Sequence, residues 1–321
     1  MKAVLVGGAG FIGVNLARAL VGRGWDVVIA ARPGVQARKP AICSEIARLG
    51  ARLHETFYSR EDLVGLGGDV YYHLAGTLAV SRERMWDAHV HLLDRLVSAA
   101  SELGARVIYV SAIVAIGRVR GMEKGSVVVE EDRHLEPGRH EWSNPFELSK
   151  AEGERLLVRR GKELEGKWAI VRPGLVVGPW AYHSEWKLIY YASKLRVYPD
   201  TPPIPITPVS DLAEILAGAG EGSFDGQWLN AVAYNRRLSE ITEVVCRELS
   251  GSRCVGVNVG GLARILGTIA QPIPAVALFE SMVSRGYRYS SRILSGRTWT
   301  EPEEAAKAFV RWAKEMGGVK V

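Results

Sequence analysis

Residues 7–13, Gly-Gly-Ala-Gly-Phe-Ile-Gly, decide the fold that this sequence predicts. They follow an apolar run, Lys2 to Val6, that predicts a buried strand, and they lead into Phe11 to Arg23, whose apolar residues recur at helical spacing. Glycines in such a turn let the backbone approach a pyrophosphate, and the amino-terminal end of the helix attracts the phosphate charge. The glycines at positions 7, 10 and 13 therefore predict a dinucleotide-binding turn.

The alternation of strand and helix continues along the first half of the chain. Short apolar runs without polar interruption are typical of parallel strands that helices cover on both faces. We therefore predict an α/β fold with a doubly wound parallel sheet over residues 1–173. The pattern loosens after Pro173, so residues 174–321 are predicted to form a smaller substrate-binding region, partly interleaved with the first. The expected strands are Asp26–Ala31, Asp69–Leu74, Arg106–Val110 and Trp168–Val171, and the expected helices are 85–103, 145–161, 236–250, 260–283 and 301–316.

The end of the second predicted strand bears on the choice of dinucleotide. Folds that prefer NAD place a carboxylate there to bind the adenosine ribose, whereas NADP requires positive charge for its 2′-phosphate. Here the acidic position is Ala31 and the next residue is Arg32, with Arg38 and Lys39 nearby. A guanidinium can form a charge-assisted pair with the phosphate, so the sequence favours NADP(H) over NAD.

The composition indicates an ordinary globular protein. The 321 residues are 47% apolar and 24% charged, and the net charge of +6 is dispersed along the chain, so nucleic acid binding is not indicated. The longest uncharged stretch, Ile265 to Phe279, is short and interrupted by prolines, which argues against a membrane span. Met1 to Val6 leads directly into the glycine turn, so we expect no signal peptide.

The numbers of cysteine and of side-chain amide residues indicate the cellular compartment and the growth temperature of the source. The three cysteines, Cys43, Cys246 and Cys254, show no zinc-binding spacing, and so few cysteines favour the reducing cytoplasm. Whether Cys246 and Cys254 pair is left open by the sequence. Arginine dominates the basic residues, and asparagine and glutamine are scarce, which suggests a thermophilic source.

Four segments stand in a characteristic order: GGAGFIG at 7–13, HLAG at 73–76, VRPGLVVGP at 171–179 and SDLA at 210–213. Together they resemble the extended short-chain dehydrogenase/reductase family, the group of NAD(P)-dependent epimerases and dehydratases. The resemblance covers nearly the whole chain. It implies a Rossmann domain, a carboxyl-terminal substrate domain, a nucleotide-linked or phosphorylated small-molecule substrate, and homodimers through the helices at 85–103 and 145–161. With Arg32, the implied cofactor site comprises Gly7, Gly10, Phe11, Ile12, Gly13, Leu74, Ala75, Gly76, Lys150, Pro173 and Val176.

The catalytic residues that the family implies are altered. The family uses a serine or threonine, a tyrosine, and a lysine four positions after the tyrosine, where the ammonium lowers the pKa of the phenol. Lys150 is present, but the tyrosine position is Phe146, and the hydroxyl position falls on Ala112, one residue beyond Ser111. Lys150 and Ser111 are the catalytic candidates that remain, and the family's usual asparagine corresponds to His89. Substitute proton donors are Glu147, Ser149, Ser111, Tyr182 and His183.

Two functions from different classes stay open. The first is an atypical NADP(H)-dependent enzyme, an oxidoreductase or epimerase/dehydratase with a non-standard proton donor. The second is a non-catalytic NADP(H)-binding scaffold or redox-sensing protein, which the loss of both hydroxyl positions favours. Aromatic and basic residues between Trp180 and Tyr191 fit either a cleft for a nucleotide or phosphorylated ligand, or a hydrophobic lid or dimer surface.

Overall fold

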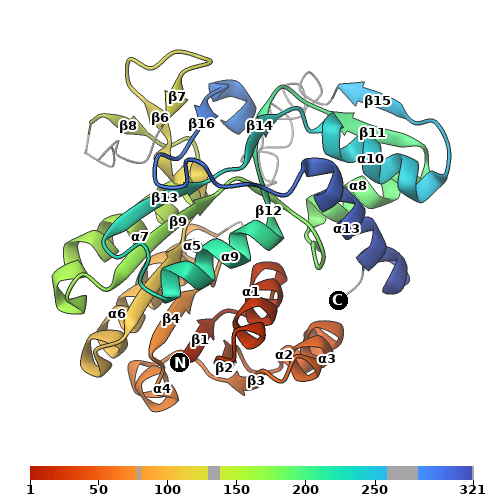
Figure 1. Ribbon diagram of the computed structural model, residues 1–321. Coiled ribbons are helices and arrows are strands. Elements are labelled where there is room, and N and C mark those ends of the chain that lie inside the picture. Colours follow the sequence, from red (N-terminus) through yellow and green to blue (C-terminus); the bar gives the residue numbers. More distant parts are fainter. Residues whose placement is uncertain (78–80, 129–137, 259–280, 320–321) are drawn as a thin grey trace.

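The computed structural model describes residues 1–77, 81–128, 138–258 and 281–319. Within them, a seven-stranded parallel sheet runs through the centre of the protein (Figure 1). Its order is β3-β2-β1-β4-β5-β9-β13, so the chain changes its direction of travel across the sheet between β1 and β4. The doubly wound parallel sheet predicted from the sequence is confirmed. The strands are β1 (Lys2–Val6), β2 (Asp26–Ala31), β3 (Arg52–Glu55), β4 (Val70–His73), β5 (Arg106–Val110), β9 (Trp168–Pro173) and β13 (Gln227–Ala231).

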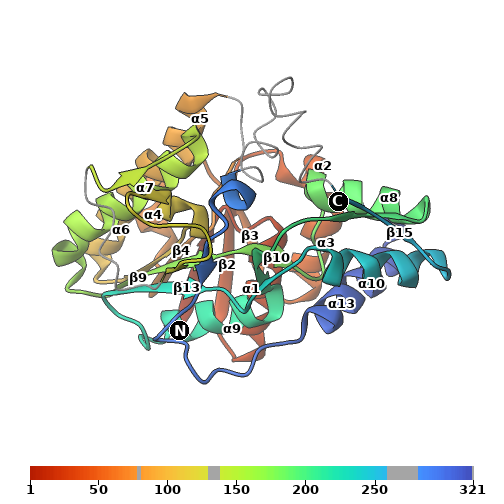
Figure 2. The same ribbon diagram turned by 90° about the horizontal axis from the view of Figure 1, so that it is seen from above.

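Alternate residues of each strand point into two separate cores, one on each face of the sheet. In β1, Ala3 and Leu5 join one core while Val4 and Val6 join the other, and all four side chains are fully buried. This two-sided burial is why the inner strands are mostly apolar, whereas the edge strand β3 reads Arg-Leu-His-Glu and is largely exposed. Helices α1 (Phe11–Gly22), α3 (Pro40–Arg48) and α9 (Val209–Gly220) cover the first face, and α4 (Arg60–Leu66), α6 (Leu92–Leu103) and α7 (Pro145–Arg160) cover the second (Figure 1, Figure 2).

The last third of the chain completes the central sheet and also builds a flanking layer. β13 pairs in parallel with β9 and forms the edge strand of the sheet. In the flanking layer, β10 (Leu175–Val177), β12 (Ile204–Pro208) and β14 (Tyr234–Arg236) form a small sheet, and α10 (Ser239–Ser250) packs against both α8 (Ser184–Lys194) and α13 (Pro302–Glu315). The helices predicted at 236–250 and 301–316 are confirmed as α10 and α13, whereas the one at 260–283 falls largely outside the described residues. The remaining elements include α2 (Val35–Arg38), β6 (Arg118–Val119), β7 (Val127–Val128), β8 (His140–Glu141), β11 (Val197–Asp200), β15 (Val255–Asn258) and β16 (Arg288–Tyr289).

The helix predicted over 85–103 is not continuous. Helix α5 (Arg82–Trp86) is followed by a π-helical turn over Asp87–His91, and α6 begins at Leu92. Such turns within helices are frequently found at functional sites. Here the turn carries His89, whose side chain is fully buried.

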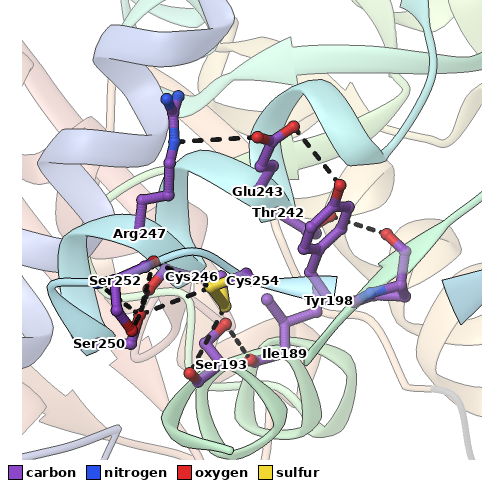
Figure 3. The surroundings of a disulfide bond; sticks show 11 residues. Ile189, Ser193, Tyr198, Thr242, Glu243, Cys246, Arg247, Ser250, Ser252 and Cys254 are labelled. Atoms are coloured by element: carbon purple, nitrogen blue, oxygen red, sulfur yellow. Dashed lines mark hydrogen bonds and ion pairs between the residues drawn. A yellow bond between two sulfur atoms is a disulfide. The ribbon is translucent and has the colours of Figure 1, made fainter. Parts of the chain in front are cut away.

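A disulfide joins Cys246 of α10 to Cys254, which lies just before β15 (Figure 3). Their Cα atoms are 6.3 Å apart. Helix α10 ends at Ser250, and Gly251, with φ +65, turns the chain so that Cys254 reaches back to the helix. The pairing that the sequence left open is therefore present, and Cys43 is a free thiol. The bond ties the exposed strand β15 to a buried position of α10.

The described ranges contain no helix with the length and apolar character needed to cross a bilayer. The uncharged run Ile265 to Phe279 lies outside those ranges. Among the same described residues, His, Cys, Asp and Glu side chains nowhere gather in the groups of three or more that could hold a metal ion.

Candidate functional site

The glycine turn between β1 and α1 is shaped by close backbone contacts. Gly7 has φ +76, and a Cβ there would lie 2.6 Å from the Cα of Ala75. A Cβ on Gly13 would lie 1.9 Å from the carbonyl oxygen of Gly8, so only glycine lets α1 pack onto the turn. A Cβ on Gly10, by contrast, would meet nothing nearer than the Tyr182 hydroxyl at 3.6 Å. The turn is tight at its two ends and open at its centre.

The first turn of α1 attracts negative charge. It begins after Gly10, which has no side chain that could cap the helix, and it contains no acidic residue. The helix dipole concentrates partial positive charge on the backbone N–H groups at this end. The open centre of the turn and these donors together fit the pyrophosphate of a dinucleotide, in the place expected from Gly10, Phe11 and Ile12.

A lysine and a tyrosine meet above this turn. The Lys39 ammonium donates hydrogen bonds to the Ala9 carbonyl oxygen at 2.7 Å and to the Tyr182 hydroxyl at 2.9 Å. Asn15 of α1 donates to the Pro179 carbonyl oxygen at 3.0 Å and so fixes the segment that carries Tyr182. The Lys39 ammonium and the Tyr182 hydroxyl can both donate to a phosphate oxygen beside the turn. Sequence reasoning did not reveal this pair, because its two members are far apart in the chain.

The aromatic segment that follows is mostly core. Trp186 and Tyr190 of α8 are buried, and the Trp186 ring packs against Phe309 of α13 with ring centroids 5.1 Å apart. The His183 ring packs edge-on against Phe11, with centroids 6.2 Å apart, at the beginning of α1. Of the aromatic residues in this segment, Tyr182 and His183 therefore lie beside the glycine turn.

The end of β2 carries charges of both signs. The largely exposed Arg32 guanidinium lies 3.2 Å from a carboxylate oxygen of Asp87. The Arg38 guanidinium donates to two carbonyl oxygens of its own loop, at 2.9 and 3.3 Å. Glu55, at the end of the neighbouring strand β3, accepts a hydrogen bond from the Gly34 amide at 3.1 Å. Asp87 thus partly compensates the positive charge that Arg32 would offer to a 2′-phosphate.

Lys150 of α7 directs its ammonium to the carboxyl edge of the sheet. It donates to the carbonyl oxygen of Val110, the last residue of β5, at 2.9 Å. A Cβ on Gly76 would lie 3.9 Å from the Lys150 Nζ and equally far from the His89 Nε2. Burial lowers the pKa of Lys150 to about 7, against the opposing effect of the Glu154 carboxylate. A lysine with this pKa exists in both charged and neutral forms near neutral pH, so it can accept or release a proton.

Phe146 lies one helical turn before Lys150. Asn144 begins this helix by accepting a hydrogen bond from the Glu147 amide at 3.0 Å. The Phe146 ring packs edge-on against His89, with ring centroids 5.4 Å apart, and it contacts the same apolar cluster as Ala112. The two positions where the family implies hydroxyl groups are therefore occupied by apolar side chains that pack on one cluster.

His89 is held in one tautomer by a hydrogen bond on each ring nitrogen. Its Nε2 accepts from the Thr77 amide at 3.3 Å, so the ring proton is on Nδ1, 2.8 Å from the Ser149 Oγ. Ser149 in turn donates to the Phe146 carbonyl oxygen at 3.0 Å. Burial, and then the nearby Lys150, lower the pKa of His89 well below its ordinary value. His89 and Ser149 thus connect α7 to the segment after β4 and offer no free proton.

Ser111 belongs to a buried ion pair. Its hydroxyl donates to Glu154 at 2.5 Å, and Glu154 accepts three further hydrogen bonds from the Arg172 guanidinium, at 2.9, 3.1 and 2.5 Å. The side chains of Glu154 and Arg172 are 0% and 3% exposed. Successive side chains in extended backbone point to opposite sides, which is why Ser111 and its neighbour Ala112 have different surroundings. The Ser111 hydroxyl is committed to Glu154.

Glu147 forms a second buried ion pair, with Arg285. Its carboxylate also accepts hydrogen bonds from the Ser281 hydroxyl at 2.5 Å and from the Ser143 amide at 2.9 Å. Arg285 and Ser281 lie more than 130 positions further along the chain, so no local pattern in the sequence could have indicated this pairing. Glu147 therefore connects α7 to residues 281–285 through its ion pair and hydrogen bond.

The other residues of the expected cofactor site lie along the ends of the strands. The Leu74 amide donates to the carbonyl oxygen of Val6 at 2.9 Å, which places Ala75 and Gly76 directly beyond β4. Pro173 ends β9, and Val176 of β10 accepts a hydrogen bond from the Trp186 indole at 3.1 Å. The structure therefore brings the segment after β4 together with the glycine turn and with Lys150.

The sheet order and the glycine turn define a Rossmann-type α/β protein. Comparison with known proteins adds the family: the profile of the NAD dependent epimerase/dehydratase family matches residues 3–209, which is more than half of the chain. The chain belongs to this family. None of the curated protein sequences matches it significantly.

Solved structures with the same fold include sugar-nucleotide epimerases. UDP-glucuronic acid 4-epimerase from Bacillus cereus, in complex with UDP-glucuronic acid and NAD, is 19% identical, with a TM-score of 0.71 over 98% of this chain and 100% of that chain. A tyrosine-to-phenylalanine mutant of that enzyme, with UDP-4-deoxy-4-fluoro-glucuronic acid and NAD, is 18% identical, with a TM-score of 0.72 over the same shares. UDP-glucose 4-epimerase from the hyperthermophile Thermotoga maritima, with UDP-glucose, is 16% identical, with a TM-score of 0.74 over 98% and 99%. At these identities the likeness establishes the shared fold.

Proposed function

We propose that this chain is an atypical NADP(H)-dependent enzyme of its family, an oxidoreductase or epimerase/dehydratase in which Lys150 takes the place of the usual tyrosine. The observation that carries the proposal is the position of the Lys150 Nζ at the carboxyl edge of the sheet, with a pKa lowered to about 7 by burial. Phe146 and Ala112, where the family implies hydroxyl groups, have no proton to exchange.

The chain's own groups divide the work as follows. A bound nicotinamide supplies the hydride chemistry. The neutral Lys150 amine accepts a proton from a substrate hydroxyl as its carbon is oxidised, and the ammonium returns a proton in the opposite direction. The glycine turn, Lys39 and Tyr182 hold the pyrophosphate. Ser111 and Glu147 stay outside the proton path, because the Ser111 hydroxyl is bonded to the buried Glu154 carboxylate and Glu147 is paired with Arg285.

The substrate that we propose is a small molecule linked to a nucleotide or carrying a phosphate. Support comes from the family and from the related epimerases of Bacillus cereus and Thermotoga maritima, whose structures contain UDP-sugars. We assign cofactor binding to residues 1–173 and substrate binding to 174–321, partly interleaved with the first part.

We propose NADP(H) as the preferred dinucleotide. Ala31 provides no carboxylate for the ribose, and the Arg32 guanidinium is largely exposed at the end of β2. Two observations favour NAD instead: the Glu55 carboxylate lies beside this site, and the Bacillus cereus structure contains NAD. Titration of the protein with NADPH and with NADH distinguishes the two dinucleotides. Arg32→Ala should weaken NADPH binding about tenfold and leave NADH binding unchanged. Arg38→Ala is the matched control, because its guanidinium bonds to its own loop.

The enzymatic proposal is tested on purified protein. Nucleotide released by denaturation is identified, and the stripped protein is then titrated with NADPH and NADH and assayed with UDP-sugars and carbonyl compounds. We expect turnover whose pH profile has an inflection near pH 7, and loss of that turnover in Lys150→Met assayed at saturating dinucleotide. Nucleotide that stays bound and unchanged by every substrate would instead favour the non-catalytic scaffold or redox-sensing function, and absence of binding would contradict both.

Phe146→Tyr restores the tyrosine that the family usually has at this position. It tests whether the site can still use a tyrosine or depends on Lys150 alone. A sharp rise in activity would mean that the rest of the site still serves a tyrosine. Unchanged activity, with the inflection near pH 7 retained, would support Lys150 as the acid–base group in its own right.

The assembly and the location of the protein are also proposals. We propose a homodimer through α5–α6 and α7, on which Leu103 and Val158 are partly exposed apolar side chains, and sedimentation equilibrium would test it. We place the protein in the cytoplasm of a thermophile. The Cys246–Cys254 disulfide agrees with this, because cytoplasmic disulfides are common in hyperthermophiles.

A further inference from the structure

A cavity lies on the flank of the protein, where the carboxyl-terminal helix α13 meets α1 and α3. It has a volume of about 560 Å³ and is lined by residues of α1, α3 and α13 and by Pro179 and Trp180. This volume falls within the range of small-molecule sites, roughly 300–1,000 Å³. None of the residues of the glycine turn lines it, and neither Lys150 nor Phe146 does.

Positive charge exceeds negative charge in the lining of this cavity. Arg18 of α1, Arg48 of α3 and Arg311 of α13 line it together with the carboxylates of Glu45 and Glu315. Glu45 is shared by two of the arginines, at 2.6 Å from Arg18 and 2.7 Å from Arg48. Arg311 forms no ion pair within the described part of the chain. Three guanidinium groups facing one space are suited to bidentate binding of a phosphate.

The apolar wall of the cavity has two unusual features. Trp180 and Trp312 form it, with ring centroids 5.6 Å apart. Trp180 has φ +70, a backbone conformation that is rare and costly for a bulky residue and that is often found at ligand sites. The buried indole N–H of Trp312 has no acceptor among the residues that the structure describes. A strained residue and an unsatisfied donor thus lie in the same wall.

We propose that this cavity is a ligand site separate from the glycine turn, and that it binds an organic phosphate with a small apolar body. The phosphate is bound by the arginines, with Arg311 contributing a guanidinium that pairs with no carboxylate of the described residues. The apolar body lies against Trp180 and Trp312. Inorganic phosphate alone would fill only a fraction of the volume, so it should bind more weakly than a phosphate monoester.

The proposal is tested by calorimetric titration of the full chain, saturated with dinucleotide, with phenyl phosphate as the probe and inorganic phosphate for comparison. We expect saturable binding of phenyl phosphate that Arg311→Gln weakens about tenfold or more. Lys314→Gln is the matched control, because Lys314 is an exposed cation on the same helix that does not line the cavity. It should change the affinity by less than about twofold.

Either of two results would overturn the proposal. One is no saturable binding of phenyl phosphate by the unmodified protein at millimolar concentration. The other is equal weakening by Arg311→Gln and Lys314→Gln, which would mean that the probe responds only to net charge. Both variants change exposed side chains, so both are expected to fold. Dinucleotide binding is measured separately, so failure of this site leaves the proposed enzymatic function untouched.

Discussion

Replacing Lys150 with methionine measures the cost of burying an ammonium group at the carboxyl edge of the sheet. Burial lowers the pKa of Lys150 from 10.5 to about 7. Between these two pH values the unfolded chain holds one more proton than the folded protein, so the free energy of unfolding rises with pH. The difference of about 3.5 pKa units corresponds to about 5 kcal/mol. This stability is present above pH 10.5 and is lost as the pH falls to 7.

Methionine keeps the length and apolar packing of the side chain and cannot be protonated. Lys150→Met should therefore exceed the unmodified protein in stability by several kcal/mol at pH 7 and below, and the difference should vanish towards pH 10. Urea unfolding, followed by far-ultraviolet circular dichroism between pH 6 and pH 10, gives the free energy of unfolding of both proteins.

Lys314→Met, which changes an exposed lysine, controls for the loss of a positive charge. It should leave the pH dependence of the unmodified protein unchanged. Parallel curves for Lys150→Met and the unmodified protein over the whole pH range would refute the reasoning, because they would show that Lys150 stays charged in the folded state. The same result would remove the basis for its proposed part in proton transfer.

Three further predictions concern buried polar groups and the disulfide. Burial lowers the pKa of His73 to about 3, so stability present above pH 6.5 is lost as the pH falls towards 3, and His73→Phe should resist acid unfolding, followed by circular dichroism. Glu154→Gln leaves the Arg172 guanidinium buried without a counter-charge, so it should lower the free energy of unfolding in urea by about 3–5 kcal/mol. The double replacement Glu154→Leu with Arg172→Met removes both charges and should recover most of that loss. Cys254→Ser opens the loop closed on Cys246 and should cost about 2–3 kcal/mol, and a reducing agent should destabilise the unmodified protein equally without affecting the variant.

Five of the seven strands of the central sheet could be predicted from the sequence, because each is a short apolar run. The two edge strands could not: β3 reads Arg-Leu-His-Glu and is largely exposed, and β13 contains Gln227 and Asn230. β2 begins at Asp26 and ends at Ala31, as predicted, because both faces of the strand are buried and the run stops where burial stops. The π-helical turn before α6 was not predicted. The sequence Asp87–His91 carries no signal that separates it from an α-helix, and the turn is recognised in the structure by its backbone hydrogen bonds, such as the one from the Leu92 amide to the Asp87 carbonyl oxygen.

Much of the site depends on residues that are distant in sequence. Lys150 and Phe146 could be placed on one helix from their spacing, but the buried state that lowers the pKa of Lys150 depends on the sheet against which α7 packs. The pairing of Glu147 with Arg285 likewise joins two segments that no local pattern relates. The disulfide was undecidable for a different, local reason: its cysteines are eight residues apart, and Cys254 reaches Cys246 because the chain turns at Gly251.

The position of β13 has a consequence for how the chain folds during synthesis. The family profile ends at residue 209, yet the edge strand beside β9 is formed by Gln227 to Ala231. Until that segment leaves the ribosome, β9 presents an unpaired edge of backbone N–H and carbonyl groups, which is a template for association with other chains. A fragment that ends at residue 209 would keep this edge open permanently, so we expect it to aggregate although it contains the whole glycine turn and Lys150.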